Sequence, residues 1–392
     1  GFDVDHRVAP DLADGLRAHR DESDVSHVLA MEPMSWDGRL LLDRLGVESV
    51  RNDQFTCHYD DFATWAEGRS SFKMEDFYRW QRRRLDVLME DGTDGPEPAG
   101  GRWNFDDENR ERPPKDGRSW PSIERFELDD IDREVIDSLP DSCWGAEPDG
   151  TWPVTRAQAL VRLDEFVTTG LAPFGPHEDA MLAAEWKLAH SVLASSMNLG
   201  LLHPSEVVEA AADAYWAGSA PINSVEGFVR QVIGWREYVW GVFWLWMPEY
   251  REMNALDAGR PVPPVFASGA DTEMACVANA MRHLDAHGYT HHIERLMVFG
   301  NLALTSGVDP WAMTEWMWSS FVDGAEWVML PNVIGMALFA DGGRMATKPY
   351  ASGGAYINRM SDSCSSCRFD PKQRTGPDAC PFTTLYLSLI HI

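Results

Sequence analysis

The chain has 392 residues, and its 34 Lys and Arg residues against 62 Asp and Glu residues give a formal charge of −28. Hydrophobic residues make up 44% of the sequence and charged residues 24%, a composition typical of globular proteins. No apolar run reaches the ~18 residues of a membrane-spanning helix, so no membrane partner is expected, and six cysteines are too few for a disulfide scaffold. The length predicts two or three domains. Residues 1–5 resemble no signal peptide, so we expect a cytoplasmic protein.

The positive charges are biased towards arginine. Five are lysines, so the other 34 − 5 = 29 are arginines. Many acidic residues with few lysines are typical of halophile proteins, whose acidic surface stays hydrated, and an ordinary acidic protein is the alternative. The net charge argues against nucleic-acid binding, because phosphate contacts are electrostatic. This argument weakens for a halophile, in which local arginine patches matter more than net charge.

The N-terminal part of the sequence predicts an α/β domain over residues 1–90. The apolar run 25–31 predicts a buried strand, a helical pattern follows at Leu40 to Leu45, and Gly46 and Val47 open a second strand. Residues 59–90 are predicted to be helical. Four arginines of this segment fall on one side of a helix, where a solvated face is favoured over a phosphate site: Arg79, Arg82, Arg83 and Arg84.

Residues 91–150 are predicted to connect two domains. Gly and Pro are frequent between residues 92 and 114, with charged residues between them. The segment 100–110, Gly-Gly-Arg-Trp-Asn-Phe-Asp-Asp-Glu-Asn-Arg, is too aromatic for a loose linker. Long loops of this kind are often functional.

From residue 151 onward, the sequence predicts an almost entirely helical domain. Apolar residues recur at three- and four-residue steps, which predicts helices over 155–167, 178–193, 204–216, 224–246, 272–286, 292–305 and 310–321. The 17 tryptophans are best explained by core packing. In a helical protein they can also stack on a planar cofactor or carry electrons.

Three cysteines near the C-terminal end form the sharpest local motif. Cys364, Cys367 and Cys380 follow a Cys-x2-Cys-x12-Cys pattern, whose short turn directs two sulfurs at one centre. A fourth ligand is needed, and the candidates are Cys276, Cys143 and Cys57. The spacing favours zinc and an iron–sulfur cluster about equally, and the tryptophan-rich helices tilt the choice slightly towards iron–sulfur.

Several motifs in one order resemble a known family. Residues 224–238, Ser-Val-Glu-Gly-Phe-Val-Arg-Gln-Val-Ile-Gly-Trp-Arg-Glu-Tyr, are similar to the flavin-domain helix of photolyases and cryptochromes. Residues 335–343, 348–350 and 355–360, together with four cysteines, resemble the iron–sulfur bacterial cryptochromes and photolyases. This family is also called photolyase-related, or prokaryotic (6-4) photolyase. The resemblance runs from about residue 25 to Tyr386 and includes residues 101–106.

The resemblance implies the cryptochrome/photolyase fold. It implies an incomplete Rossmann-like α/β antenna domain over 1–90, a linker over 91–150, and an all-α C-terminal domain over 151–386 that binds FAD. It also implies a lumazine-type antenna chromophore, for which Glu32 and Trp36 are candidate contacts. The ligands implied for a [4Fe-4S] cluster are Cys276, Cys364, Cys367 and Cys380.

The same resemblance implies light-driven repair of (6-4) pyrimidine photoproducts in UV-damaged DNA. A photoexcited, fully reduced flavin can inject an electron into the lesion, and a neighbouring acid must then move a proton. Histidine suits this role because its pKa lies near neutrality. His291 and His292 fall where the family has paired active-site histidines, with His292 favoured as the donor, and Tyr350 matches a pocket tyrosine. The lesion must leave the duplex to reach the flavin, and we expect a monomer.

Further residues are assigned by their positions in the family. The implied flavin contacts are Ser191, Arg295, Asn301, Asp323 and Asn332. Trp316 fits the proximal tryptophan of a photoreduction chain, and Trp318 lies close to it in sequence. Core packing is the alternative explanation for both tryptophans.

The sequence departs from the family pattern at three places. The Ser-x-Leu-Ser-Pro turn that holds FAD phosphates is Ser-Val-Leu-Ala-Ser here, over residues 191–195. Ser268 replaces a tryptophan eight residues before the first cysteine of the cluster, and Met329 replaces an acidic residue expected near the flavin. The change at Ser268 puts the photoreduction route in doubt, though not repair by flavin that the cell has already reduced. The change at Met329 bears on radical stability or redox poise.

Two alternative functions remain open at this point. A cryptochrome of the same fold would sense light without repair, and Ser268 and Met329 leave room for it. His291, His292 and Tyr350 favour repair instead. A zinc-stabilised helical binding module requires the resemblance to be false.

Both ends differ from the family pattern. The family starts with a strand–helix–strand before the position of Gly1, so we expect the antenna domain to be incomplete. After Leu385 and Tyr386 the family continues with tryptophan, whereas here the sequence ends Leu-Ser-Leu-Ile-His-Ile. We interpret residues 387–392 as a translated sequencing adapter and assign no function to His391.

Overall fold

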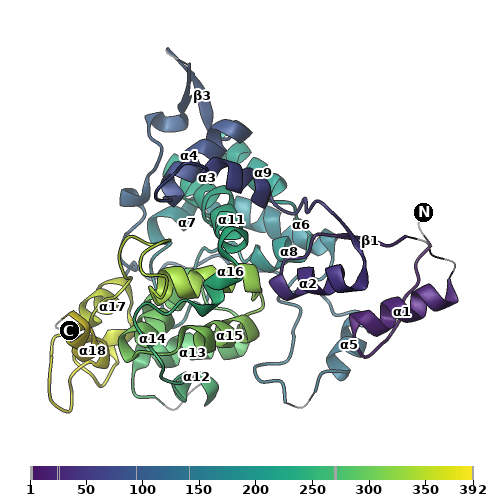
Figure 1. Cartoon of the computed structure of the whole chain (residues 1–392). Helices are drawn as coiled ribbons and strands as arrows, with labels where there is room; N and C mark the ends of the chain where they lie inside the picture. The colour runs from purple at the N-terminus through teal and green to yellow at the C-terminus, as the bar shows by residue number, and fades with distance from the viewer. Residues whose placement is uncertain are drawn as a thin grey trace. The chain divides into compact units, whose positions relative to one another are not determined.

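The computed structural model describes residues 3–23, 25, 27–93, 95–140, 142–268 and 272–390 (Figure 1). Its contacts divide the chain into two units, Gly1–Asp53 and Gln54–Ile392. None of the described helices is long and apolar enough to cross a membrane.

The first unit contains the predicted strand, helix and second strand, but the first strand is shorter than predicted and is exposed at Leu29 and Met31 rather than buried. Its elements are α1 (Leu12–Glu22), β1 (Leu29–Met31), α2 (Trp36–Leu45) and β2 (Glu48–Val50). The two strands pair in parallel, with Leu29 opposite Glu48, so α2 forms the crossover that a parallel pair requires. The Ser35 side chain caps α2 by accepting a hydrogen bond from Gly38 N–H, and Gly46 ends the helix with a φ of 60°. Residue 26 of the predicted first strand lies outside the described residues.

The second unit is largely helical. It begins with α3 (Tyr59–Ala66), α4 (Met74–Leu85) and the antiparallel hairpin β3 (Met89–Gly92) and β4 (Gly95–Pro98), followed by η1 (Ala99–Gly101), η2 (Asp106–Glu108) and α5 (Asp130–Asp137). Its middle contains α6 (Arg156–Glu165), η3 (Phe166–Gly170), α7 (Leu171–His177), α8 (Ala194–Asn198), α9 (Pro204–Trp216), α10 (Ile222–Val229), η4 (Arg230–Arg236) and α11 (Glu237–Trp246). The remaining elements are η5 (Glu249–Glu252), α12 (Val265–Ser268), α13 (Ala275–His287), η6 (Glu294–Gly300), α14 (Asn301–Ser306), α15 (Pro310–Ser320), α16 (Glu326–Pro331), η7 (Asn332–Ala337), α17 (Gly354–Met360), η8 (Ser363–Ser365) and α18 (Pro381–Ile390).

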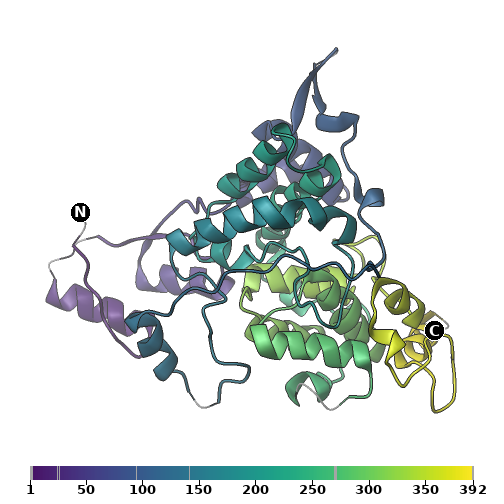
Figure 2. The ribbon, with the colours of Figure 1, turned by 180° about the vertical axis from the view of Figure 1, so that it is seen from behind.

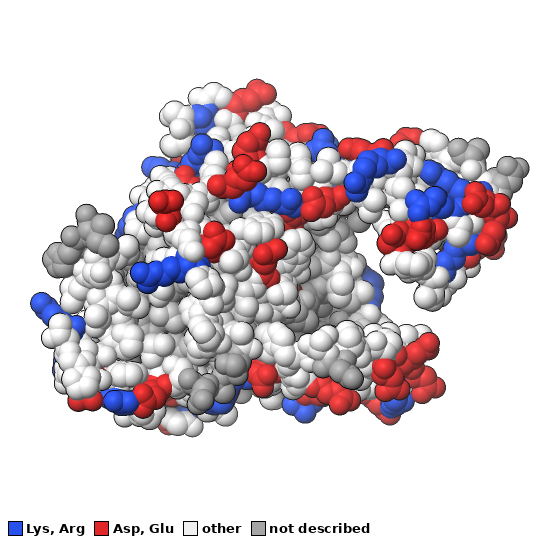
Figure 3. Space-filling view, turned by 60° about the horizontal axis from the view of Figure 1, so that its bottom comes forward, with Lys and Arg blue, Asp and Glu red and all other residues white. Residues whose placement is uncertain are grey.

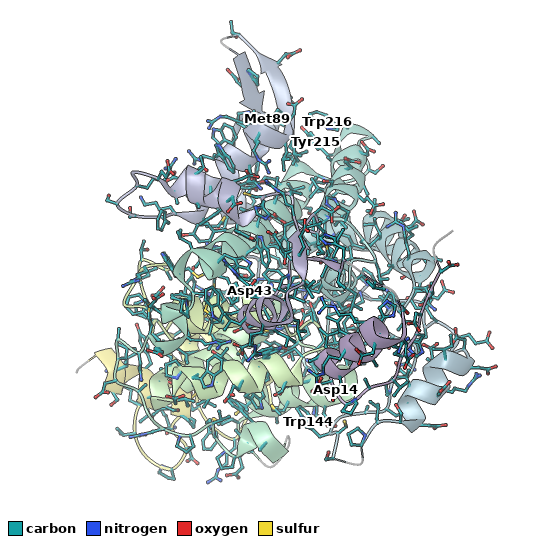
Figure 4. All side chains as sticks on the ribbon, turned by 45° about the vertical axis from the view of Figure 1, so that its right-hand side comes forward. Asp14, Asp43, Met89, Trp144, Tyr215 and Trp216 are labelled. Atoms are coloured by element: carbon teal, nitrogen blue, oxygen red, sulfur yellow. The ribbon has the colours of Figure 1, made fainter. Side chains whose placement is uncertain are left out.

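The helices around α10 form the centre of this unit. α10 contacts α7 and α9, and it continues through η4 into α11 as the long helical run predicted for residues 224–246. A continuous apolar cluster joins these helices, with Val225, Val229 and Ile233 fully buried. In Figure 4, Met89 marks the start of the β3–β4 hairpin, and Tyr215 and Trp216 mark the end of α9.

Helices α3 and α4 belong to the second unit, although the sequence assigned them to the N-terminal domain. Phe62 of α3 and Phe77 of α4 are fully buried, and both rings contact Tyr238 of α11. The observed units divide between Asp53 and Gln54 rather than near residue 90. The reason is that the apolar faces of these two helices are buried against α11 and η4.

The predicted connection over residues 91–150 is partly packed against the helices. The backbone N–H of Phe105 donates a hydrogen bond of 3.0 Å to the Glu226 carboxylate on α10. The buried side chain of Asn109 donates to the carbonyl of Asn223 at 3.0 Å. The aromatic segment 100–110 is therefore docked, as its composition suggested.

One predicted helix is wrong. Residues 178–193 form irregular backbone rather than a helix, and Leu188 and Val192 have positive φ angles of 46° and 51°. The backbone N–H of Met181 donates to the carbonyl of Met360 instead of to a helical neighbour. The apolar residues are needed here because much of the segment is buried without being helical, with residues 187–190, 192 and 193 all buried.

Four π-helical segments occur among the described residues: η3, η4, η6 and η7. A π turn widens the helix by one residue and is frequent at functional sites. Three of the four lie together around one cavity, described below.

The C-terminal elements pack beside α13 and α14. Figure 2 presents this part of the second unit from behind, with α17 and α18 in yellow. α18 contacts α14 and α17, and η8 contacts α13. Residues 387–390, interpreted from sequence as an adapter, continue α18, and residues 391 and 392 lie outside the described residues.

We predict that Gly241→Ala destabilises the second unit. A Cβ atom at Gly241 would lie 2.1 Å from the Phe62 ring, so α11 and α3 would have to move apart. Overpacking of this kind typically costs about 1 to 3 kcal/mol, measurable as the free energy of unfolding in urea. Gly259→Ala is the matched control, because a Cβ atom there meets nothing within 4 Å. Equal stability of the two variants would contradict the close packing of α3 on α11.

Candidate functional site

The second unit contains a cavity of about 690 Å³. This volume lies within the range of roughly 300 to 1,000 Å³ that is usual for ligand and cofactor pockets. Its walls come from η4, η6 and η7, from the irregular segment after α7, and from the loop that contains Tyr350. Much of the lining is apolar, including seven methionines and two tryptophans: Met74, Met197, Met297, Met317, Met329, Met336, Met360, Trp235 and Trp327.

The cavity brings together most of the residues assigned from sequence. Six of them line it: Ser191, His292, Arg295, Asp323, Asn332 and Tyr350. Met329 also lines the cavity, where the family pattern placed an acidic residue. Four predicted residues do not line it: His291, Asn301, Trp316 and Trp318.

Arg295 and Asp323 form a two-point ion pair on the wall. The guanidinium Nη1 and Nη2 atoms lie 2.9 and 3.2 Å from the two carboxylate oxygens. Nε of Arg295 also donates to the carbonyl of Thr290 at 2.7 Å, and the guanidinium lies 4.1 Å from the centre of the Phe321 ring. These contacts fix the charges in place, because a two-point arginine–carboxylate pair restricts both position and orientation.

Asn301 acts behind the wall. Its amide nitrogen donates to the carbonyl of Ser352 at 2.9 Å, and its amide oxygen accepts from the backbone N–H of Ser352 at 3.1 Å. This reciprocal pair holds the loop two residues beyond Tyr350. Asn301 therefore positions the loop rather than contacting a ligand in the cavity.

Trp316 packs inside the helical core. Its indole N–H donates to the carbonyl of Phe266 at 2.9 Å, and its ring stacks on the Phe266 ring at 4.8 Å. Its neighbour Met317 reaches the cavity wall, whereas Trp318 is half-buried. The side chain of Ser268 lies outside the described residues, so the departure at that position has no structural account.

Three histidines meet at one edge of the cavity. His190 is buried, with Nδ1 2.8 Å from the carbonyl oxygen of Lys187 and Nε2 3.3 Å from Nδ1 of His292. The His292 side chain is 45% exposed, and its Nε2 atom lies 3.7 Å from the Asp179 carboxylate. His291 is fully buried and stacks on His190 with ring centres 4.6 Å apart. Burial lowers the pKa of His190 to about 3, with His292 adding a smaller repulsion, and it lowers the pKa of His291 well below its usual value.

This histidine group suits a hydrogen-bonded chain better than a metal site. The ligand-type nitrogens lie within 4.8 Å of one another. The rings of His190 and His291 are nearly parallel, with planes 16° apart. A ring nitrogen binds a metal in its own plane, so two stacked rings do not direct their lone pairs at one ion.

A buried charge network forms the opposite polar part of the lining. The guanidinium of Arg230 lies 3.3 Å from Asp106, 3.5 Å from Glu226 and 3.9 Å from Glu178. Burial raises the pKa of Glu178 to about 8, although Arg230 opposes the shift. Its Oε2 atom has no hydrogen-bond partner among the described residues. Glu178 is therefore protonated at neutral pH.

Arg236 is a buried cation with unused hydrogen-bond donors. It lines the cavity and pairs with Glu237 at 2.8 Å, and it packs 4.1 Å from the Phe55 ring centre. Its Nε and Nη2 atoms have no partner among the described residues. Because buried donors are nearly always paired, these N–H groups suit an anionic group such as a phosphate. The sequence carried a sign of this residue, since Arg236 and Glu237 interrupt an otherwise apolar helix.

The four predicted cysteines line a second, small pocket. Cys276 from α13, Cys364 from η8, Cys367 two residues after η8, and Cys380 directly before α18 face it together. Burial raises the pKa of Cys276 and Cys364, so both remain thiols in the absence of a cation. The other candidates are elsewhere, since Cys57 is buried away from this pocket and Cys143 is exposed.

Charges of both signs are interspersed over the face that Figure 3 presents. Lys and Arg alternate with Asp and Glu there rather than forming a separate basic area. On this face, the arginine bias of the sequence is therefore not visible as one continuous patch.

A family of photolyase-related proteins and two photolyases are similar to this chain. Residues 1–145 match the family model of the deoxyribodipyrimidine photo-lyase-related proteins. A (6-4) photolyase from Agrobacterium fabrum is 44% identical over 376 residues, which are 93% of this chain and 73% of that protein. A crystal structure of a bacterial class III photolyase from Agrobacterium tumefaciens matches with a TM-score of 0.56 at 18% identity, covering 89% of this chain and 71% of that one. The structural match supports a common fold.

We predict that Glu178 makes the folded state less stable as the pH rises. Burial holds the pKa of Glu178 at about 8 in the folded chain, whereas the unfolded chain releases the proton near the ordinary glutamate pKa of 4.5. Between these values the unfolded state binds fewer protons, so its population grows with pH, by up to about 1.4 kcal/mol per pH unit. The stability of Glu178→Gln relative to the original chain should therefore rise between pH 5 and 8 in denaturant unfolding. Glu209→Gln, an exposed control, should show no such trend, and a constant difference for Glu178→Gln would contradict the raised pKa.

Proposed function

The chain belongs to the deoxyribodipyrimidine photo-lyase-related protein family, and from this premise we propose that it repairs (6-4) pyrimidine photoproducts in DNA under light. One observation carries the proposal. His292, the predicted proton donor, stands at the edge of a cofactor-sized cavity with its Nε2 atom directed away from its hydrogen-bond partner His190.

We assign the cavity to FAD. Its methionine and tryptophan lining suits a flavin ring, and the unpaired N–H groups of Arg236 suit the phosphates. Ser191, Arg295, Asp323 and Asn332 complete the proposed polar contacts. When bound in its reduced form, FAD supplies a light-absorbing one-electron donor.

The same cavity is the proposed site of the lesion. The two linked pyrimidines of the lesion must leave the duplex stack to reach it, as in other enzymes that act on bases. Tyr350, Tyr356, Arg110 and Arg359 lie on the wall and offer aromatic faces and cations to unstacked bases. Burial raises the pKa of both Tyr350 and Tyr356, so each remains a neutral hydrogen-bond donor.

His292 is the proposed acid. Its exposure lets it reach a bound base, and its Nε2 atom lies 3.7 Å from the Asp179 carboxylate. His291 is fully buried, and neither of its ring nitrogens has a hydrogen-bond partner among the described residues. We therefore assign His291 to support of the neighbouring rings rather than to proton transfer.

The second pocket is the proposed site of a [4Fe-4S] cluster. A tetrahedral zinc site with Zn–S bonds of about 2.3 Å would bring its sulfurs to about 3.8 Å from one another. Among the described residues, three histidines place ligand-type atoms within 4.8 Å of one another, whereas these cysteines form no group as close as that. The wider arrangement of the four thiols favours a larger group with several metal ions.

The first unit remains the proposed site of a lumazine-type antenna chromophore. Of its two candidate contacts, Glu32 accepts a hydrogen bond of 2.9 Å from the backbone N–H of Asn52. The guanidinium carbon of Arg39 lies over the indole ring of Trp36, 5.5 Å from the ring centre. Both side chains therefore have fixed positions within the first unit.

We predict that His292→Ala abolishes repair while the chain retains its flavin. Loss of a positioned acid typically lowers the rate by about 100-fold or more. The assay measures restored thymines in oligonucleotides that carry a (6-4) lesion, under blue light and with chemically reduced flavin. His203→Asn is the matched control, because His203 caps α9 and asparagine caps helices well. Undiminished repair by His292→Ala would refute the role of His292, and a flavin-loaded original chain without repair would point to a light sensor instead.

We predict that the anaerobically purified chain contains iron and acid-labile sulfide in equal amounts. Cys364→Ser should lower both, because it removes one of the four proposed ligands. Cys143→Ser, which changes an exposed cysteine outside the pocket, should leave both unchanged. Zinc without iron in the original chain would contradict the cluster assignment.

A further inference from the structure

A short chain of polar contacts leads from the backbone to His292. The carbonyl oxygen of Lys187 lies 2.8 Å from Nδ1 of His190, and Nε2 of His190 lies 3.3 Å from Nδ1 of His292. His190 belongs to the irregular segment after α7, and His292 directly precedes η6. The contact therefore joins two parts of the chain that are 102 residues apart.

The chemistry of these atoms fixes where the protons lie. A carbonyl oxygen only accepts hydrogen bonds, so Nδ1 of His190 must carry the proton of that contact. With its pKa lowered to about 3 by burial, His190 is neutral and has one ring proton. Its Nε2 atom is then an acceptor, and Nδ1 of His292 must be the donor. The carbonyl of Glu178 also faces the His190 ring, but the 2.8 Å contact to Lys187 already takes the single proton.

Packing holds the His190 ring in this orientation. His291 stacks against one face at 4.6 Å, and the Phe174 ring meets it edge-on at 5.5 Å and 89°. A rotation that tilts the ring plane would lose both aromatic contacts, and a flip of the ring in its plane would lose the contact to Lys187. Its acceptor nitrogen is thus preorganised toward His292.

We propose that His190 is a positioning residue that holds His292 in the Nδ1–H tautomer and thereby makes Nε2 of His292 the atom that gives its proton to the substrate. The proposal rests on the proposed function, in which His292 is the acid. It adds a third histidine to the two that the sequence singled out.

The proton balance follows directly. Doubly protonated His292 breaks its Nε2–H bond as a nitrogen or oxygen of the lesion forms a bond to that proton, and the electron pair stays on Nε2. His292 is left neutral with its remaining proton on Nδ1, the tautomer that the acceptor of His190 stabilises. The Asp179 carboxylate lies 3.7 Å from Nε2, the nitrogen that gives up its proton. The product tautomer and the hydrogen-bond acceptor therefore match.

The test reads the tautomer of His292 by nitrogen NMR of the flavin-loaded full chain, labelled with 15N-histidine and kept in the dark. The His292 resonances are assigned by their absence in His292→Ala. The original chain should give a protonated Nδ1 and a bare Nε2 at a pH where His292 is neutral. His190→Phe keeps the stacked ring but removes the acceptor, so it should give a mixture of both tautomers. His190→Gln returns an acceptor near the position of Nε2 and should restore the original signature.

Repair is measured on the same variants. His190→Phe should repair roughly tenfold more slowly at full flavin content, the loss typical when a partner that orients a functional histidine is removed, and His190→Gln should recover most of the rate. His291→Phe keeps the stack and should leave the tautomer of His292 unchanged, because the His291 nitrogens have no partner among the described residues.

The outcomes separate this inference from the proposed function. A protonated Nε2 in neutral His292 of the original chain, or an unchanged tautomer in His190→Phe, would overturn the role of His190 whether or not the chain repairs DNA. The predicted tautomers without any repair would instead refute the proposed function and leave His190 as the residue that sets the tautomer. If His190→Phe does not fold, the signature of the original chain and of His190→Gln still decides the question.

Discussion

The structure depends on opening a cavity of about 690 Å³ inside a helical unit without leaving backbone groups unpaired. A regular helix offers no such space, because its hydrogen bonds fix the path of the chain. Three helical runs widen into π turns where they pass the cavity: η4, η6 and η7. Each wide turn keeps backbone pairing while it redirects side chains such as Arg236, Arg295 and Asn332 inward. The unusual helix geometry is thus the local condition for a site at this position.

The cavity wall then has to carry polar groups away from water. Arginines there are balanced by carboxylates, as in the two-point pair of Arg295 with Asp323. The buried histidine His190 is uncharged instead of being paired with a carboxylate. Burial keeps its ring neutral, and its two nitrogens contact the carbonyl of Lys187 and the imidazole of His292. Some buried polar atoms of the wall have no partner among the described residues, including Oε2 of Glu178 and Nε and Nη2 of Arg236. Because buried polar groups are normally paired, such atoms mark places where a bound ligand would supply the missing hydrogen bonds.

The sequence predicted the type of most elements, because helical periodicity and a parallel strand pair leave clear apolar patterns. It also identified six residues of the cavity wall through the family resemblance. It could not tell Asn301 from a ligand contact, because position in a motif does not reveal which way a side chain points around a widened helix. The boundary between the units was missed for a related reason. The apolar faces of α3 and α4 would suit either unit, and only the contacts of Phe62 and Phe77 with Tyr238 decide between them.

The largest failure of periodicity falls on the part of the chain that matters most for the site. The segment 178–193 was predicted to be helical but is irregular, with positive φ angles at Leu188 and Val192. A helix would direct side chains three and four residues apart to one face. The irregular path instead brings Glu178 and His190, twelve positions apart, to the same cavity. Sequences depart from regular secondary structure where a site needs several side chains from one short segment. The contrast between the helical spacing of apolar residues in 178–193 and its irregular backbone is therefore itself a sign of function.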